Sequence, residues 1–182
     1  MIVANQKRKE NIAEYLLYMW QVEDLIRANH FDLEAIRKQV VERYDQPAEV
    51  KEEIARWYEE LIQMMLTEGV KEEGHIQLNK NVIITLTELH LRLLRSPKEM
   101  IYGAAYYKTL PYIVELRSKS GQTNIPELET CFSAIYGYIL LKMQQKPVSD
   151  QTMEAIKQIS SFLGILSEKY RMEKEGKLEI EE

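Results

Sequence analysis

Residues 7–28 read KRKENIAEYLLYMWQVEDLIRA, a stretch in which apolar side chains recur at helical spacing. At 100° per residue, one helical face collects Ile12, Leu16, Met19 and Ile26. The other faces also carry apolar side chains, namely Leu17, Trp20, Val22 and Leu25. A helix that is apolar almost all round is buried on most sides. The segment from about Lys7 to Ala28 is therefore predicted to be a central helix.

Six further helices are predicted from the same periodicity and from capping residues. Their expected ranges are about 33–44, 47–68, 78–95, 98–119, 126–145 and 149–172. The run from Thr130 to Leu141 carries no charge, so the helix that contains it is the second central helix. Pro111 is expected to kink or break its helix after Tyr107. The predicted fold is all-α, an irregular bundle of about seven helices in which the first and the sixth are central.

Two of these helices carry apolar stripes that favour self-association. The first stripe has the 4, 3, 4, 3 spacing of two heptads and consists of Val50, Ile54, Trp57, Leu61 and Met64. The second consists of Met153, Ile156, Ile159, Leu163, Leu166 and Tyr170. A stripe that exceeds the needs of the internal core is available to a second copy of the chain. We therefore predict a homodimer, with a mass in solution near twice 21.5 kDa.

The length and the charge of the chain limit its possible folds and partners. A chain of 182 residues is predicted to form one helical domain over residues 1–172, followed by a charged tail over residues 173–182 that frays. The tail carries much of the net charge of −5, and no helix has a Lys/Arg stripe, so no nucleic-acid partner is predicted. The longest strongly apolar run is shorter than the roughly 20 residues of a membrane span. Without a membrane span or a recognisable signal peptide, the expected location is the cytoplasm.

Sequence signatures of catalysis are absent. The chain has no glycine-rich phosphate loop, no Walker sequence and no Gly-x-Ser-x-Gly elbow. Glu72 and His75 form one Glu-x-x-His match, whereas a di-metal bundle needs two such pairs on helices. The only cysteine, Cys131, lies in an apolar run and is predicted to be a buried, inert thiol. No catalytic residue, metal or cofactor is predicted.

Polar residues at positions where a helix buries apolar ones are the candidate ligand-binding residues. Glu23 lies on the apolar face of the first helix, with Arg27 one turn later, and His90 lies at the centre of the face of the fourth helix. In one interpretation Glu23 and Arg27 form an internal ion pair and His90 is a hydrogen-bonded core histidine. In the other, these three residues line a polar pocket between the two helices.

Tyrosine is unusually frequent, with 11 copies against three phenylalanines. Tyr106 and Tyr107 are among those on helices predicted to be buried. Such tyrosines either edge the core with their hydroxyls reaching water, or line a pocket for a small polar-aromatic ligand. The second interpretation adds Tyr106 and Tyr107 to the candidate ligand-binding residues.

The stretch KRKENIAEYLLYMWQVEDLIR, residues 7–27, resembles the opening of a bacterial family of unknown function. Members of that family are helical proteins of about this length, so the resemblance covers the whole chain. It implies a helical fold and a bacterial, cytoplasmic protein. It implies no activity, cofactor or catalytic residue.

The leading functional hypothesis is a non-enzymatic protein-interaction or self-associating module. The alternative is a small-molecule-binding helical bundle, conceivably an enzyme, with a polar, tyrosine-lined pocket. An enclosed cavity surrounded by Glu23, Arg27, His90 and tyrosines would favour the alternative.

Overall fold

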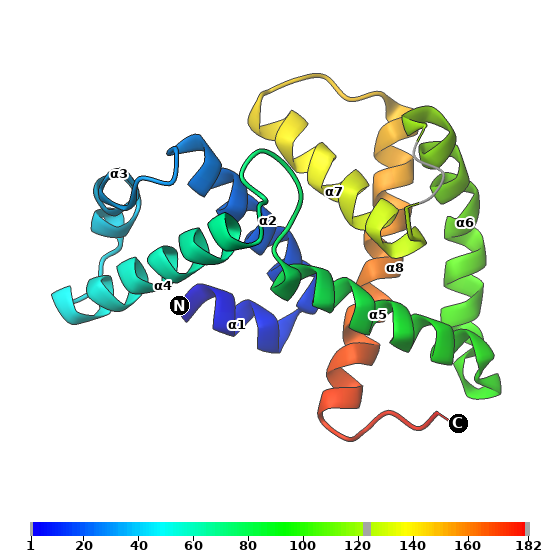
Figure 1. Ribbon diagram of the computed structural model, residues 1–182. Coiled ribbons are helices and arrows are strands. Elements are labelled where there is room, and N and C mark those ends of the chain that lie inside the picture. The colour runs from blue at the N-terminus through cyan, green and yellow to red at the C-terminus, as the bar shows by residue number, and fades with distance from the viewer. Residues whose placement is uncertain (1, 122–124, 181–182) are drawn as a thin grey trace. The chain divides into compact units, whose positions relative to one another are not determined.

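The computed structural model of the chain describes residues 2–121 and 125–180. Within these residues the chain forms eight α-helices, two short 3-10 helices and no strand, which confirms the all-α prediction (Figure 1). The elements are α1 (Ile2–Glu10), α2 (Ile12–Ala28), α3 (Leu33–Gln39), η1 (Val41–Arg43), α4 (Ala48–Thr67), α5 (Gln77–Arg95), η2 (Pro97–Glu99), α6 (Met100–Ser120), α7 (Glu127–Met143) and α8 (Asp150–Lys174). No helix in the described ranges is long and apolar enough to cross a membrane.

The chain divides into two compact units. Unit 1 comprises residues 1–9 and 14–82, and unit 2 comprises residues 10–13 and 83–182. Helix α5 begins in unit 1 and continues into unit 2, because the division falls after Val82. The single domain over residues 1–172 remains a prediction.

Unit 1 is built around α2, as expected for the segment quoted first. The almost completely buried side chains of α2 include Leu16, Met19, Trp20 and Ile26. Helix α4 packs against α3 and η1 and buries Ile54, Tyr58, Leu61 and Met65. This face is rotated from the predicted heptad stripe, because Val50 and Trp57 are only half-buried and Met64 is exposed. The stripe on α4 is therefore not simply the core-facing side of that helix.

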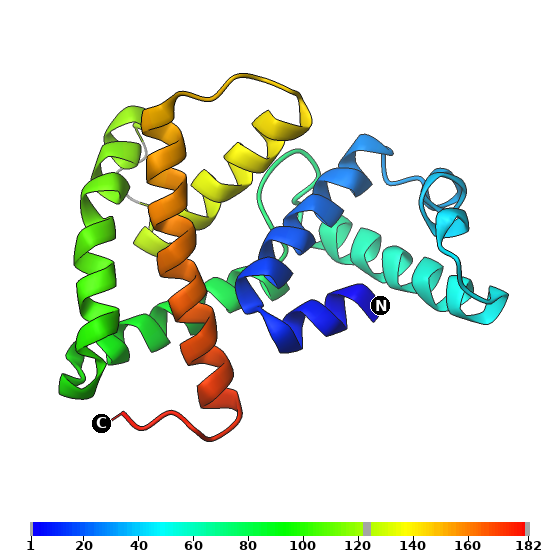
Figure 2. The same ribbon diagram turned by 180° about the vertical axis from the view of Figure 1, so that it is seen from behind.

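Unit 2 is a layered arrangement of long helices. Helix α8 runs along both α6 and α7, which the two opposite views agree on (Figures 1 and 2). The middle of the predicted α8 stripe is buried in this packing, with Ile156, Ile159, Leu163 and Leu166 all inside. Helix α7 buries its first half through Leu128, Cys131, Phe132 and Ile135. Most of the α8 stripe thus serves the core and is not available to a second copy.

The first predicted helix is two helices in the structure, which raises the count from about seven to eight. The break falls at Asn11, whose side-chain Oδ1 accepts a hydrogen bond from the backbone N–H of Ala13 at 3.0 Å. Asparagine is a preferred residue at a helix start because its side chain replaces a missing backbone acceptor. The long apolar pattern masked this boundary.

The predicted break near Pro111 is wrong, because α6 continues through it without interruption. A proline removes the hydrogen bond to the carbonyl four residues earlier, here that of Tyr107. Both residues are exposed, so water can satisfy that carbonyl. The lost bond therefore lies where its cost is smallest.

Several helix ends agree with the capping residues in the sequence. Asp32 caps α3 by accepting from the backbone N–H groups of Glu34 and Ala35, and Ser149 caps α8 by accepting from Thr152. Gly176, with φ of 68°, follows the end of α8 in the left-handed conformation that glycine adopts readily. The helix thus continues to Lys174, inside the predicted tail. Residues 181–182 of that tail, and residues 122–124 of the loop expected after α6, lie outside the described residues.

Candidate functional site

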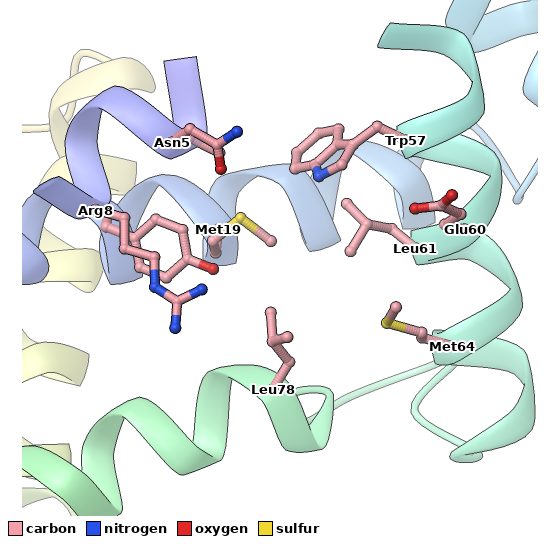
Figure 3. Close-up of a pocket in the computed structure, with 10 residues that line it drawn as sticks. Asn5, Arg8, Met19, Trp57, Glu60, Leu61, Met64 and Leu78 are labelled. Carbon is pink, nitrogen blue, oxygen red and sulfur yellow. The ribbon is translucent and has the colours of Figure 1, made fainter. Parts of the chain in front are cut away.

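A small pocket opens in unit 1 between α1, α2, α4 and the first turn of α5 (Figure 3). Its volume is about 150 Å³. The lining residues are Ala4, Asn5, Arg8, Tyr15, Met19, Trp57, Glu60, Leu61, Met64 and Leu78. A second hollow of about 360 Å³ beside Gln39 and Tyr44 is a wide-open depression. The four-helix pocket is the better candidate site, because it is the more enclosed of the two.

The inner surface of the four-helix pocket is mainly apolar. Met19 and Leu61 are buried beneath it, Trp57 is half-buried, and Met64 and Leu78 are exposed at its edge. The rotation of the buried face of α4 explains why Trp57 and Met64 are available. They follow the heptad spacing, but the core takes other residues of the helix, so both side chains remain at the surface.

The rim of the pocket carries opposite charges. Figure 3 shows Arg8 and Glu60 on opposite sides, with Asn5 near the Trp57 edge. The guanidinium carbon of Arg8 lies 5.6 Å from the centre of the Tyr15 ring, within the range of a cation–π contact. This contact holds the cation beside the pocket. The site therefore offers an apolar surface with a positive and a negative end.

A buried carboxylate lies elsewhere in unit 1. Glu23 is fully buried, and its Oε1 accepts from the backbone N–H of Ile76 and from Nδ2 of Asn79, each at 2.9 Å. Its Oε2 lies 2.5 Å from Nδ1 of His75. An ionised carboxylate only accepts, so Nδ1 is then the donor. A buried carboxylate is costly unless it is hydrogen-bonded, and these three donors meet that need. The expectation that Glu23 is buried and bonded to several donors is confirmed.

The imidazole of His75 is held on two sides. Besides Glu23, it stacks on the indole of Trp20 with ring centroids 4.1 Å apart and planes 7° from parallel. Its side chain remains about a quarter exposed. This contact ties the loop before α5 to the buried side of α2.

Arg27 holds the same loop from the next turn of α2. It donates to Oδ1 of Asp24 at 2.8 Å, to the carbonyl of Val70 at 3.1 Å and to the carbonyl of Gly74. Among the described residues its partners do not include Glu23, so the predicted internal ion pair is wrong. The reason is that both side chains are used by the loop, which offers backbone acceptors to the cation and donors to the carboxylate.

His90 lies in the core of unit 2. Its Nδ1 is 2.6 Å from the hydroxyl of Tyr102, and its ring is edge-on to those of Tyr106 and Phe162. Burial lowers the pKa of His90, while the negative charge of Glu127 opposes that shift. These contacts are those of a hydrogen-bonded core histidine that stays neutral.

Tyr106 and Tyr107 are neighbours in the chain with different surroundings. The hydroxyl of Tyr106 donates to Oε2 of Glu127 at 2.7 Å, and burial together with this carboxylate raises the pKa of Tyr106. The adjoining ring of Tyr107 has its centroid 5.2 Å away but is two-thirds exposed. Tyr107 therefore belongs to the outer face of α6.

The family model of a domain of unknown function, DUF4924, matches residues 1–177. The chain belongs to this family. The match bears out the resemblance to a family of unknown function that spans nearly the whole chain. No curated protein and no solved structure matches the chain.

The residues predicted to bind a ligand fall into two groups. Glu23 and Arg27 hold one loop in unit 1, and His90, Tyr106 and Tyr107 gather in unit 2. None of the five is among the residues given above as lining the two hollows. The four-helix pocket was missed. Its one sequence signal was the heptad stripe, which pointed to Trp57, Leu61 and Met64.

Neither the metal-ligating side chains of the described residues nor the Cys131 thiol forms a further candidate site. The described residues contain no group of three or more His, Cys, Asp or Glu side chains that could hold a metal ion. Cys131 is fully buried, and burial raises the pKa of its thiol to about 12. A thiol in this state has almost no thiolate at neutral pH, and the thiolate is the reactive form.

Proposed function

We propose that this protein is a non-enzymatic interaction module that self-associates through the outer face of α6. The observation that carries the proposal is an apolar stripe on that helix. Its large members are Met100, Ile101, Tyr107 and Val114, with exposures of 77, 81, 67 and 57%. Single exposed apolar side chains are ordinary, but a contiguous row on one helix is typical of an interaction site.

The stripe has the spacing of one helix face. Met100, Ala104, Tyr107, Pro111 and Val114 are separated by four, three, four and three residues, and all five are exposed. At 1.5 Å per residue this face is about 20 Å long. It lies opposite the buried residues of α6, such as Tyr102 and Ile113. A partner helix can therefore lie along it without disturbing the core of unit 2.

We favour a second copy as the partner, because an antiparallel pair of α6 helices matches large side chains with small ones. When the two-fold axis crosses α6 at the level of Thr109, Tyr107 lies opposite Pro111 of the second copy. Ala104 then lies opposite Val114 of that copy. The small Ala104 leaves room for the bulkier Val114 to pack. A two-fold interface uses the same patch on both subunits, so each of these pairs occurs twice.

One helix face buries less than the roughly 1,200–2,000 Å² of a stable interface, so we expect a weak dimer. Sedimentation equilibrium should give a mass that rises from 21.5 kDa toward twice that value as concentration increases through the micromolar range. Tyr107→Lys with Val114→Lys should return the mass to the monomer value. Leu91→Lys is the matched control, because Leu91 is exposed on α5 and lies off the stripe. A monomeric wild type, or equal effects of both changes, would contradict the proposal.

We further propose that the protein acts in the cytoplasm of a bacterium. The resemblance to a bacterial family supports this location, and fractionation of the native host with an antibody against the chain tests it.

A further inference from the structure

We propose that the four-helix pocket of unit 1 binds a small monocarboxylic acid with an apolar body. The inference does not depend on the α6 interface, which lies in unit 2. It rests on three features of the pocket: its size, its apolar lining and the arrangement of charge at its rim.

The size of the pocket sets the size of the ligand. A cavity of about 150 Å³ lined by apolar side chains takes a guest as large as benzene. Drug-sized ligands and cofactors require roughly 300–1,000 Å³, so they do not fit. The body of the ligand is therefore a single ring or a short alkyl chain.

The lining sets the chemistry of that body. Met19, Leu61, Met64 and Leu78 present aliphatic and thioether surface, and Trp57 adds the face of an indole. Met19 and Leu61 are buried, whereas Trp57, Met64 and Leu78 retain exposed area. A ligand that covers this remaining apolar area removes it from water, which favours binding. Two methionines let the pocket adapt to guests of different shape.

The rim sets the head group. Arg8 stands beside the pocket and is held over the ring of Tyr15 (Figure 3). A guanidinium presents a planar fork of N–H donors that matches a carboxylate, and the pair is often bidentate. The Asn5 amide, on the same helix, supplies a further N–H donor at the rim. The α1 side of the pocket therefore favours an anion.

Glu60 limits the number of carboxylates to one. It stands on the opposite side of the pocket from Arg8 (Figure 3). A second carboxylate on the ligand would approach this negative charge and be repelled. The acid group is thus placed at Arg8, with the apolar body directed toward Trp57 and Leu61.

The test uses three probes with the same six-carbon chain: hexanoate, hexanol and hexylamine. The readout is the indole N–H signal of Trp57 in ¹H–¹⁵N NMR spectra, assigned with Trp57→Phe. Trp20 supplies an internal reference, because it is buried against His75 and does not line the pocket. Hexanoate should shift the Trp57 signal saturably, with a Kd on the order of 1 mM for a ligand of this size. Hexanol and hexylamine should bind about tenfold more weakly, since neither pairs with Arg8.

Two variants test the assignment of the head group. Arg8→Gln should weaken hexanoate about tenfold and leave hexanol unchanged. Lys9→Gln is the matched control, because it removes a neighbouring exposed cation that does not line the pocket. Circular dichroism verifies that both variants keep the fold. Saturable hexanoate binding that is weakened by Arg8→Gln alone supports the proposal. Absence of saturable binding, tighter binding of hexylamine, or equal effects of the two variants overturns it.

Discussion

Oε2 of Glu23 lies 2.5 Å from Nδ1 of His75, across 52 positions of sequence. The same carboxylate accepts from the backbone of Ile76 and the side chain of Asn79, so one buried side chain on α2 holds the end of a loop and the first turn of α5. The loop begins at Gly69, whose φ of 72° ends α4 in a conformation suited to glycine. Glu23 thus holds the loop that leads from α4 to α5 against the core of unit 1.

Glu23→Ala should strongly destabilise the protein, because it strands Asn79 and the amide of Ile76 inside the core. Each buried polar group left without a partner costs about 1–3 kcal/mol, so we expect a loss of about 3 kcal/mol. Glu14→Ala is the control, since Glu14 pairs with Lys7 at an exposed site and should cost less than about 1 kcal/mol. Urea unfolding measures both. Similar small losses would show that the Glu23 carboxylate is not needed.

The double variant Glu23→Leu with Arg27→Met distinguishes the observed contacts from the ion pair that the sequence suggested. If the two residues were partners, removing both would recover much of the stability lost with Glu23 alone. Because Arg27 bonds Asp24 and the loop carbonyls instead, we expect the double variant to recover none of the stability lost with Glu23. Recovery in the double variant would restore the ion-pair interpretation.

Arg27→Met should loosen the loop before it unfolds the protein. The change removes the hydrogen bonds to the carbonyls of Val70 and Gly74 while keeping the aliphatic part of the side chain. We expect hydrogen exchange at residues 70–76 to accelerate about tenfold, with little change at the core of α2. Arg37→Met is the control, because Arg37 pairs with Glu34 and Glu52 at the surface. Equal exchange rates at residues 70–76 in both variants would show that the hydrogen bonds of Arg27 do not hold this loop.

The burial of Glu23 was predictable from the helical pattern, but its partners were not. A wheel reports which face of a helix a residue occupies, and Glu23 falls on the apolar face. It does not report which distant segment covers that face. His75, Ile76 and Asn79 reach Glu23 only because the loop after α4 turns back on α2, and that turn depends on packing throughout unit 1.

The four-helix pocket was hidden for a related reason. Arg8 belongs to α1, which the apolar pattern merged with α2 into one helix. The break at Asn11 frees α1 to take its own direction, and this places Arg8 and Trp57 around one hollow. A single capping side chain decided the boundary between α1 and α2. The periodicity of the apolar residues does not reveal such a boundary. In contrast, Asp32 and Ser149 stand at the edges of apolar periodic segments, and each caps the helix that follows.

Cys131 should resist thiol reagents in the folded protein. It is fully buried, and burial raises the pKa of its thiol to about 12, so both access and thiolate are lacking. Labelling with Ellman's reagent at pH 8 should be at least about 100-fold slower than in guanidinium-unfolded protein, and the rate should follow the opening of the core. The chain has no other cysteine, so the signal reports this site alone. Rapid labelling of the native protein would refute the buried assignment.

His90 should make the protein less stable as the solution becomes acidic. Burial lowers the pKa of His90 in the folded state, and the Glu127 charge offsets only part of that shift. The unfolded chain, with a histidine pKa of about 6.5, therefore binds a proton that the folded chain does not. Stability is full above that pH and falls below it, by at most about 1.4 kcal/mol per pH unit, until His90 protonates in the fold.

Urea unfolding between about pH 7 and pH 5 measures this slope. His90→Gln keeps a hydrogen-bonding group beside Tyr102 but does not titrate, so its slope should be smaller by this contribution. Contributions that are common to the two proteins cancel in the difference. Parallel slopes would mean that His90 takes up its proton equally well in the folded chain, in conflict with its contacts to Tyr102, Tyr106 and Phe162.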